Sequence, residues 1–506
     1  MSIKLSGMVS GLDTESLVQE LVSAYNTKKE SYEKEQTKLE WKMEKWKALN
    51  SKIYKFYTGS LSAFKMQSNY NKKKTEVSDT SKASVIAATN AVTGTQNLIV
   101  KELSASGYLT GAELQTSGGN KLTSASTLSE LGITDDATIS IQAGAGEVKE
   151  ITLTKDMNIA TLVSELKKAG VNASFDEKNQ RFFVSATESG TAADFKLGGD
   201  VAALGALGLT EDAGAIRIEG KDAVIELNGA TFKSENNSFS VNGLTIEAKA
   251  VSDYKILNDG TKEYTAVSLS TTVDVDGIYD MVKGFVKEYN DLIKELEGVY
   301  NAESSRGYNP LTSEEKEAMS EDDIEKWENK IKDSLLRRDS TVSSVVSTLK
   351  GAVQSSFTVN GTSYSLSSFG IGTLSYFLSA ENEKGVLHIN GDKDDSATSG
   401  EDDKLKTMIA TDPEAVVGFF SQLGQKLYDE VGAKMRSTTL SSAFTVYNDK
   451  QMKEELTEVK GKISDWEEYV TEQEDYWYAK FAAMEKALAE LQSSTSAVTS
   501  LFGTGA

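Results

Sequence analysis

The stretch that decides the fold is residues 456–502, which read LTEVKGKISDWEEYVTEQEDYWYAKFAAMEKALAELQSSTSAVTSLF. Mostly apolar residues recur in it at alternating steps of three and four, apart from one four-four step that ends at Phe481. Such spacing places them on one side of a helix, as a seam that packs against other helices. The stripe consists of Leu456, Val459, Ile463, Trp466, Val470, Gln473, Trp477, Phe481, Met484, Leu488, Leu491, Thr495, Val498 and Phe502.

A matching stripe lies near the other end of the chain. Asp13 suits a helix N-cap, and Glu15 follows in the first turn, where the helix dipole favours an anion. Apolar residues form one helical face after this cap, and the pattern fades near residues 69–74. They are Leu17, Val18, Leu21, Val22 and Tyr25, then, after a polar span, Leu39, Met43, Trp46, Leu49 (or Asn50), Ile53, Phe56 and Leu61. The two stripes predict a fold that brings its terminal helices together.

The composition changes from Glu76, where Ser, Thr, Ala, Val and Gly dominate and short alternating runs predict strands. These runs are SVIAAT, QNLIVKEL, TISIQ, EITLTK and RFFVSAT. An amphipathic helix is predicted at 159–170, with Gly170 as its C-terminal stop. We therefore expect a compact α+β unit at 115–214, inserted within a second strand-rich region at 77–114 and 215–273.

Helical spacing returns after residue 273 and dominates the second half. An amphipathic helix is predicted at 341–353, and short strands are predicted within the Ser/Gly-rich span 354–395. Pro413 lies in the first turn of a further helix, and the final long helix is expected to begin near Asp449. The sequence thus predicts an α+β multidomain fold. Both termini form a coiled-coil-like helical stem, with two nested strand-rich head domains inserted between them.

Bulk composition excludes several classes of protein. The 506 residues carry a net charge of −22, which argues against nucleic acid as a partner, although residues 1–76 have a local balance of +5. The chain has no Cys, which excludes disulfide and thiolate chemistry. It contains no apolar run long enough to span a bilayer. Its start, MSIKLSGMVSGLDTES, lacks the pattern of a general secretory signal, so we expect retention inside or another export route.

The residues give no pattern of a catalytic or metal site, and we expect no enzyme activity and no cofactor. The single histidine, His388, lies in the strand-like GVLHIN, where packing is the commoner role. Zinc clusters need Cys or several His residues. The acidic runs at 392–395 and 401–403 lack the spacing of a calcium loop, so a solvated acidic loop is the better interpretation.

Two interpretations of the apolar stripes remain open. A helical hairpin could bury them within the chain, which suits 39–61 and 456–470 best. The outer ends differ, since 1–12 and 493–506 carry apolar residues among small, uncharged ones. Such ends hold structure poorly alone and are suited to folding on a partner.

A series of short motifs runs in order along the chain. One is the turn Leu227-Asn228-Gly229, with Asn236 or Asn237 at a second signature position. The others are SGMVSGLDTESLVQELVSAYNTKK, VTGTQNLIVKELSASGYLTG, NPLTSEEKEAMSEDDIEKWENKIKDSLLRRDSTVSSVVSTL, SSFGIGTL, EKGVLHING, TDPEAVVGFF and FAAMEKALAELQSSTSAVTSLF. Together they resemble the bacterial flagellar filament-capping family, also called flagellar hook-associated protein 2, and the turn resembles a motif shared by hook-associated proteins and flagellins. The resemblance covers nearly the whole chain except 115–214.

The resemblance implies a leg, a stem and two nested heads. We expect a flexible helical leg at 1–38 and 465–506, a helical stem at 39–76 and 274–464, a strand-rich head at 77–114 and 215–273, and an outer head at 115–214. The expected function is capping of the growing filament tip, with ordered addition of exported flagellin.

Partner-binding residues are assigned by the same resemblance. Leg residues expected to contact the filament or a neighbouring copy are Leu12, Leu17, Val18, Leu21, Val22, Tyr25, Leu491, Val498, Leu501 and Phe502. Residues expected to bind an export chaperone are Trp477, Phe481, Met484 and Leu488. The stem core is expected to contain Met43, Trp46, Ile53, Ile463, Trp466 and Val470.

The family also implies partners and location. We expect a homo-oligomeric ring that contacts flagellin and hook–filament junction proteins. The resemblance implies a pentamer, which is common in the family. A cytosolic chaperone and the flagellar type III export apparatus are expected partners, with no nucleic acid and no membrane insertion. The expected location is extracellular, at the distal tip of the flagellum.

Two other functions remain open from the sequence. The outer head could act as an adhesin that binds mucin or a host glycan. A cytosolic coiled-coil scaffold could share the same stripe.

Overall fold

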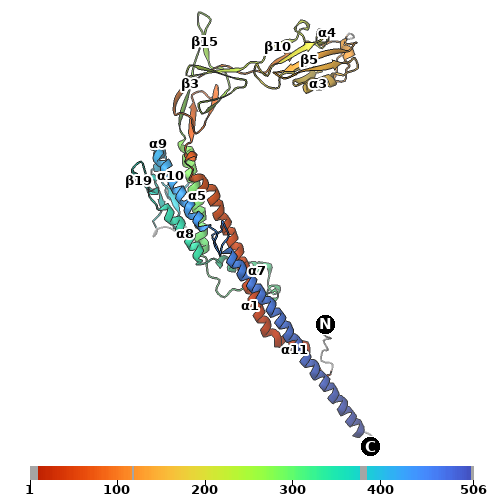
Figure 1. The fold of residues 1–506 in the computed structure, drawn as a ribbon, viewed down its shortest axis with the longest axis vertical. Coiled ribbons are helices and arrows are strands. Elements are labelled where there is room, and N and C mark those ends of the chain that lie inside the picture. Colours follow the sequence, from red (N-terminus) through yellow and green to blue (C-terminus); the bar gives the residue numbers. More distant parts are fainter. Residues whose placement is uncertain (1–8, 117–118, 376–383, 503–506) are drawn as a thin grey trace. The chain divides into compact units, whose positions relative to one another are not determined.

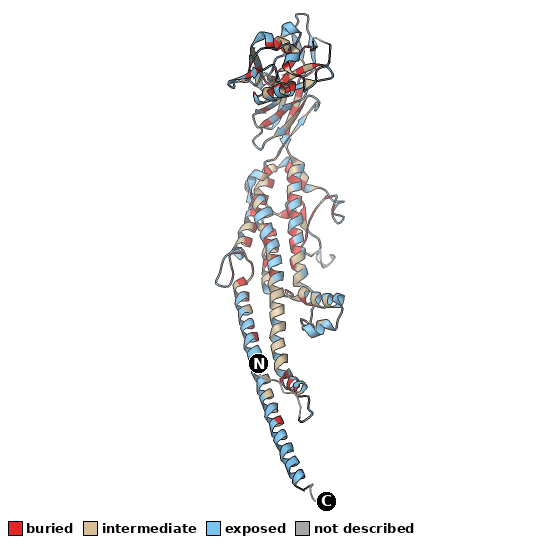
Figure 2. Ribbon diagram, turned by 90° about the vertical axis from the view of Figure 1, so that its right-hand side faces the viewer, coloured by how far each residue is buried: buried red, intermediate tan, exposed pale blue. Residues whose placement is uncertain are grey.

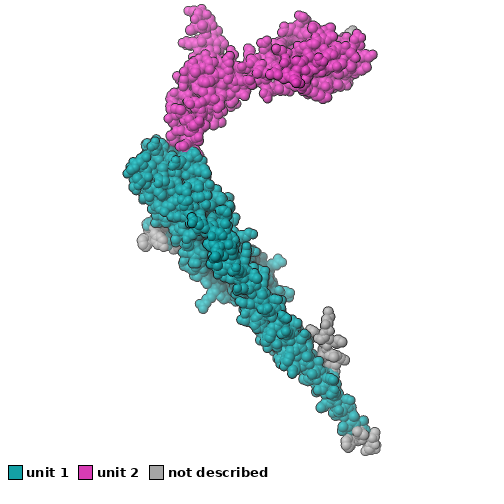
Figure 3. All heavy atoms as spheres, in the orientation of Figure 1, with its two compact units in different colours: residues 1–70, 276–506 teal, residues 71–275 magenta. Residues whose placement is uncertain are grey.

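The computed structural model describes residues 9–116, 119–375 and 384–502, in two compact units. One unit comprises residues 1–70 and 276–506, and the other comprises residues 71–275 (Figure 3). The first unit is built from both ends of the sequence, and the second from the segment between them. No helix in the described part of the chain has the length and apolarity needed to cross a membrane.

Two long helices dominate the first unit. They are α1 (Thr14–Phe56) and α11 (Asp449–Phe502), and they lie side by side in both ribbon views (Figures 1 and 2). Asp13 caps α1 by accepting a hydrogen bond from the Ser16 N–H, so the predicted N-cap is confirmed. A π-helical turn, η1 (Tyr57–Leu61), and the short α2 (Ser62–Phe64) continue α1. The predicted pairing of the terminal helices is confirmed.

Further helices belong to the same unit. They are α5 (Val275–Tyr300), α6 (Ser313–Glu317), α7 (Glu321–Ser334), α8 (Ser340–Val353), α9 (Lys404–Thr411) and α10 (Pro413–Lys434). Two small antiparallel pairs accompany them, β18 (Phe357–Val359) with β19 (Thr362–Tyr364), and β20 (Ile371–Thr373) with β21 (Leu387–Ile389). Pro413 begins α10 as predicted. Proline lacks a backbone N–H, and the N–H groups of a helix's first turn have no acceptor within the helix.

An aromatic cluster forms the core where these helices meet. The Phe64 ring stacks on Phe285 with 3.8 Å between ring centroids, and it also contacts Phe420 and Tyr70. Gly424 on α10 allows the close approach, since a Cβ there would lie 2.8 Å from the backbone nitrogen of Lys65. Helix α10 can therefore pack directly on the backbone that follows α2.

One core of the second unit lies between two antiparallel sheets. The first sheet has the order β1-β17-β3-β11-β12, and the second has the order β13-β14-β2. The bounds are β1 (Lys73–Val77), β2 (Ala83–Ala87), β3 (Gly94–Glu102), β11 (Ala223–Leu227), β12 (Ala230–Ser234), β13 (Ser238–Val241), β14 (Leu244–Ala248) and β17 (Val267–Val273). Asn228 and Gly229 join β11 to β12, both with positive φ, as a two-residue hairpin turn requires.

A second, separate core is drawn from residues 109–215. It is built around the helices α3 (Ile159–Lys168) and α4 (Val201–Ala206) and two further antiparallel sheets, β10-β4-β8-β7 and β6-β5-β9. The bounds are β4 (Tyr108–Thr110), β5 (Ala137–Ala143), β6 (Val148–Leu153), β7 (Asn172–Asp176), β8 (Arg181–Ser185), β9 (Phe195–Gly199) and β10 (Ile216–Ile218). A two-stranded hairpin, β15 (Tyr254–Ile256) with β16 (Lys262–Tyr264), completes the unit.

The predicted fold class is confirmed: helices from both termini pair, and strand-rich sheets lie between them in the sequence. The finer domain boundaries stay a prediction. Helix α1 passes the proposed leg–stem boundary at residue 38 without a break, and α11 does the same at residue 465. The compact units divide after residues 70 and 275.

Substituting Gly424→Ala tests the close packing of α10. The added methyl must displace the Lys65 backbone, so we expect a loss of about 1–3 kcal/mol in the free energy of unfolding, measured by urea titration with circular dichroism. Gly461→Ala on α11 is the control, because nothing lies within 4 Å of a Cβ there. It should be neutral or stabilising by up to about 1 kcal/mol. Equal losses in both variants would contradict this packing.

Candidate functional site

The paired terminal helices form the candidate site, and polar and aromatic contacts fix their antiparallel register. Near the middle of the pair, the Lys460 ammonium lies 3.4 Å from the Glu40 carboxylate. Further along, the Tyr25 and Tyr469 rings meet edge to face with 5.4 Å between centroids. The N-terminal part of α1 therefore packs on the middle of α11, and the two helices do not separate near residue 465.

The residues predicted for the stem core lie on α1 and α11. Trp46, Ile53, Ile463 and Val470 are buried, and Met43 and Trp466 are half-buried. Their assignment to a separate stem domain stays a prediction, because the helix pair runs through both proposed domains.

Two contacts at the base of α11 were not predicted. The Trp46 ring stacks on Tyr447 with 5.2 Å between centroids. The Asn50 side chain donates to the Phe444 carbonyl and accepts from the Val446 N–H, at 3.0 and 2.9 Å. These contacts hold the turn before α11 against α1. The partners are about 400 residues apart, and no periodicity links them.

The predicted N-terminal leg residues divide into two groups. Val18 and Val22 are buried, and Leu17 and Tyr25 are half-buried. Leu12 and Leu21 are exposed. The structure thus brings Val18, Val22 and Tyr25 into the seam with α11, so that in this conformation only part of the proposed contact face is open to a partner.

The predicted chaperone-binding residues lie on α11 on both sides of Glu485. Trp477, Phe481, Met484 and Leu488 are all half-buried. The indole Nε1 of Trp477 is buried with no hydrogen-bond acceptor among the described residues. A buried donor without an acceptor destabilises the packed state. Hydrogen bonding within the helix pair is therefore less complete at Trp477 than near Trp46, where Asn50 pairs with two backbone groups.

Glu485 marks the far end of the pairing. Its carboxylate accepts from the Val9 N–H at 2.9 Å and from the Ser10 N–H at 3.3 Å, and the Ser10 hydroxyl also donates to it. The Ser10 hydroxyl and the backbone N–H groups lower the pKa of Glu485 below its usual value. No sequence pattern pointed to this contact, because Glu485 lies beside the apolar stripe and is not part of it.

Beyond Glu485, α11 continues with little cover from the described part of the chain. Figure 2 shows these last turns in the exposed colour. Leu491 is 66% exposed and Val498 is 52% exposed. Leu501 and Phe502 end the helix, and their side chains lie outside the described residues, as do residues 1–8 and 503–506. The helix pair thus ends in a single apolar-striped helix.

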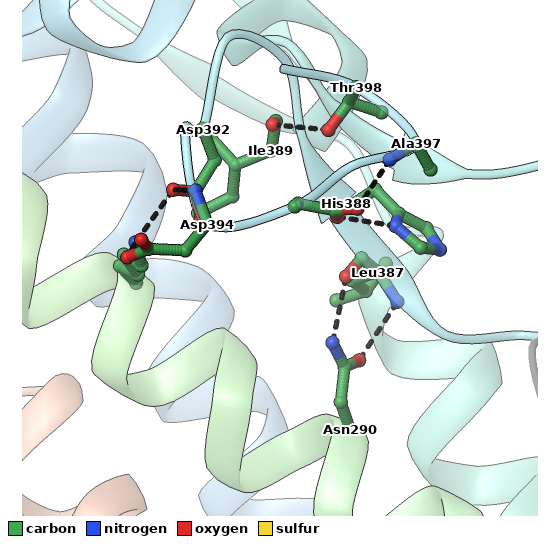
Figure 4. Close-up of polar contacts among 10 residues, drawn as sticks. Asn290, Leu387, His388, Ile389, Asp392, Asp394, Ala397 and Thr398 are labelled. Carbon is green, nitrogen blue, oxygen red and sulfur yellow. Dashed lines mark hydrogen bonds and ion pairs between the residues drawn. The ribbon is translucent and has the colours of Figure 1, made fainter.

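The acidic loop after β21 lies elsewhere in the first unit (Figure 4). The His388 Nδ1 lies 2.6 Å from Asp395, and the Lys283 ammonium from α5 lies 2.6 Å from Asp392 and 2.5 Å from Asp394. Although partial burial opposes it, the hydrogen bonds to Asp392 and Asp394 raise the pKa of Lys283. Lys283 thus pairs with two of the loop's carboxylates, and no metal-binding cluster occurs among the described residues.

Family comparisons match both parts of the chain. The family described as "Flagellar hook-associated protein 2 C-terminus" matches residues 220–493, and "Flagellar hook-associated protein 2 N-terminus" matches residues 10–106. The flagellar hook-associated protein 2 of Halalkalibacterium halodurans is 23% identical over 99% of this chain and 100% of its own. The A-type flagellar hook-associated protein 2 of Pseudomonas aeruginosa is 28% identical over 59% of this chain and 64% of its own.

Among solved structures, the D1-D2-D3 domains of the flagellar cap protein FliD from Escherichia coli are similar with a TM-score of 0.49 and 19% identity. That similarity covers 76% of this chain and 95% of the other. The sequence matches define a structural protein of the bacterial flagellum. The chain belongs to the flagellar hook-associated protein 2 family, which is the family of the flagellar cap.

Glu485 gives a pH-dependent prediction. A carboxylate whose pKa is lowered in the folded state stabilises it above the unfolded pKa of 4.5, and this contribution is lost as the pH falls through the folded value. We expect Glu485→Gln to accelerate amide exchange at residues 9–12 near neutral pH. Relative to the wild type, the effect should fade as the pH falls below 4.5 and through the lowered pKa of Glu485.

Hydrogen-exchange mass spectrometry of the N-terminal peptide measures the ratio of the exchange rates of Glu485→Gln and the wild type at each pH. Glu490→Gln is the matched control, because Glu490 is an exposed carboxylate on the same helix. Exchange in Glu485→Gln that equals the wild type near neutral pH would show that Glu485 does not hold the N-terminal segment.

Proposed function

We propose that the chain caps the growing filament tip as a homo-oligomer and promotes the ordered addition of exported flagellin. Membership of the family across both terminal segments is the observation that carries this proposal. Secretion through the flagellar type III export apparatus and contact with hook–filament junction proteins are part of it. So is a ring of five copies.

The end of the helix pair is our candidate for the filament contact. Leu12 precedes α1 and Leu21 lies on it, and both are exposed. Leu491 and Val498 are exposed on α11, so several small apolar contacts are available. A cap that must release and rebind as each subunit is added needs contacts that are individually weak. Several weak contacts on each leg, repeated around a ring, give strong attachment without one large interface.

Capping therefore depends on the last turns of α11. A chain shortened to residue 492 should keep the α1–α11 pair, since Tyr469 and Glu485 remain, but should fail to support filament growth. Circular dichroism checks the fold, and filament length on cells that lack their own cap protein checks capping. Filaments of normal length would contradict the proposal.

Charge substitutions in the full-length chain distinguish the loss of an apolar contact from the loss of the last turns of α11. Leu491→Asp with Val498→Asp should shorten filaments strongly, because both side chains belong to the exposed apolar stripe. Ser493→Asp with Ser500→Asp adds the same charge to the same exposed helix end and should have a small effect. Equal shortening by the two pairs would point to charge alone and count against an apolar contact.

We also propose that residues 477–488 bind an export chaperone before secretion. Trp477 and Phe481 lie on the part of α11 that pairs with α1, so a chaperone bound there must take the place of α1. The buried Trp477 Nε1, which has no acceptor among the described residues, supports a seam that can exchange partners. The chaperone would thereby keep the two terminal helices apart until export.

Phe481→Asp with Leu488→Asp should abolish co-elution with the chaperone in size-exclusion chromatography, because each change puts a charge into the apolar interface. Ala483→Asp with Ala487→Asp is the matched control on exposed positions of the same helix, and it should leave the complex intact. Unchanged co-elution of the first pair would exclude this binding site.

A further inference from the structure

We propose that the β15–β16 hairpin of one copy adds as an edge strand to β10 of the neighbouring copy. The inference rests on the proposed homo-oligomer and names the surfaces that join its copies. Both surfaces belong to the second compact unit, and Figure 1 labels β10 and β15.

The hairpin has no core of its own. Every residue from 253 to 263 is exposed, including Ile256 at 69%, and no third strand pairs with β15 or β16 among the described residues. Figure 1 shows it standing away from the neighbouring sheets of its unit. Because an isolated two-stranded hairpin is only marginally stable in water, this hairpin would gain stability from a partner.

The hairpin is nevertheless held in one conformation by its own contacts. The Tyr254 and Tyr264 rings lie 5.4 Å apart across the strands, and the Lys262 ammonium lies 4.3 Å from the Tyr254 ring centre. At the turn, Asp259 accepts hydrogen bonds from the Thr261 N–H and hydroxyl. Tyr254, Ile256 and Tyr264 share one face, so a preformed apolar surface is presented.

Strand β10 offers a complementary surface. It ends the sheet β10-β4-β8-β7, so one edge of its backbone pairs with no strand among the described residues. Ile216 and Ile218 are 65% and 53% exposed on one face. Between them, the Arg217 side chain is tied back by Asp194 and by the Phe195 carbonyl. An exposed apolar edge strand is a template for pairing with another chain.

One register satisfies both surfaces. If β16 adds antiparallel to β10, Ile216 lies opposite Tyr264, Arg217 opposite Glu263 and Ile218 opposite Lys262. The apolar face of the hairpin then meets the apolar face of β10. Glu263 lies on the other face with Arg217, whose guanidinium is already paired with Asp194. Cross-strand apolar pairs stabilise antiparallel sheets.

The proposed contact joins two different surfaces, and this determines the kind of assembly. A contact of one patch with itself gives a two-fold dimer, whereas contact between two different patches gives a ring when the rotation closes. The hairpin-to-edge contact is of the second kind, as a ring-shaped cap requires. Its three-residue length suits a contact that acts together with others around the ring.

Disulfide trapping tests the register directly, because the chain has no Cys. In an antiparallel pair, facing Cα atoms lie about 4.5–5.5 Å apart, within the range for a disulfide. The double variant Ile218→Cys/Lys262→Cys should form a ladder of covalent multimers on oxidation. Mixing the two single variants should give covalent heterodimers and no higher species.

The control is Ile218→Cys/Lys255→Cys, because Lys255 lies on the other strand and the other face of the hairpin. It should give much less cross-linking. Native mass spectrometry of the unoxidised proteins separates two kinds of failure. Oligomers without cross-links in Ile218→Cys/Lys262→Cys, or equal cross-linking in the control, would overturn this interface and leave the cap function intact. A wild-type chain that stays monomeric would instead contradict the proposed homo-oligomer.

Discussion

The antiparallel pairing of α1 with α11 is the constraint on which the first unit depends. It joins segments from opposite ends of the sequence, and the rest of the chain must fit between them. The two helices are unequal, with 43 residues in α1 and 54 in α11. Because α1 begins at Thr14 and Glu485 holds the residues just before it, α11 extends beyond its partner. The inequality creates the apolar helix end to which we assign the filament contact.

The packing and hydrogen bonding between α1 and α11 change along the helix pair. Near the base, Trp46 stacks on Tyr447 and Asn50 satisfies two backbone groups. Toward the end, the buried Nε1 of Trp477 lacks an acceptor among the described residues. A well-satisfied base with a weaker end lets one helix pair serve as a permanent support and as an exchangeable surface. That gradient is the physical basis for proposing both a chaperone contact and a filament contact on α11.

The sequence predicted the regular part of this structure well. The Asp13 cap, the start of α11 at Asp449 and the burial of Trp46 and Ile53 follow from capping and periodicity, which are local properties. Which surface covers an apolar stripe is not a local property of the sequence. Val18 and Val22 were assigned to an external contact, yet the chain buries them itself, since periodicity shows that a face is apolar but not what covers it. The contact of Glu485 with Ser10 was likewise invisible, because 475 residues separate them.

The central claim is that α11 beyond Glu485 touches filament subunits while its earlier turns support the chain's own fold. Site-specific photo-cross-linking on growing filaments tests this most directly. A photoreactive residue at Val498 should give a covalent adduct with flagellin, and the same residue at Glu455, an exposed position near the base of α11, should give none. Adducts of equal yield from both positions, or an adduct from Glu455 alone, would contradict the account.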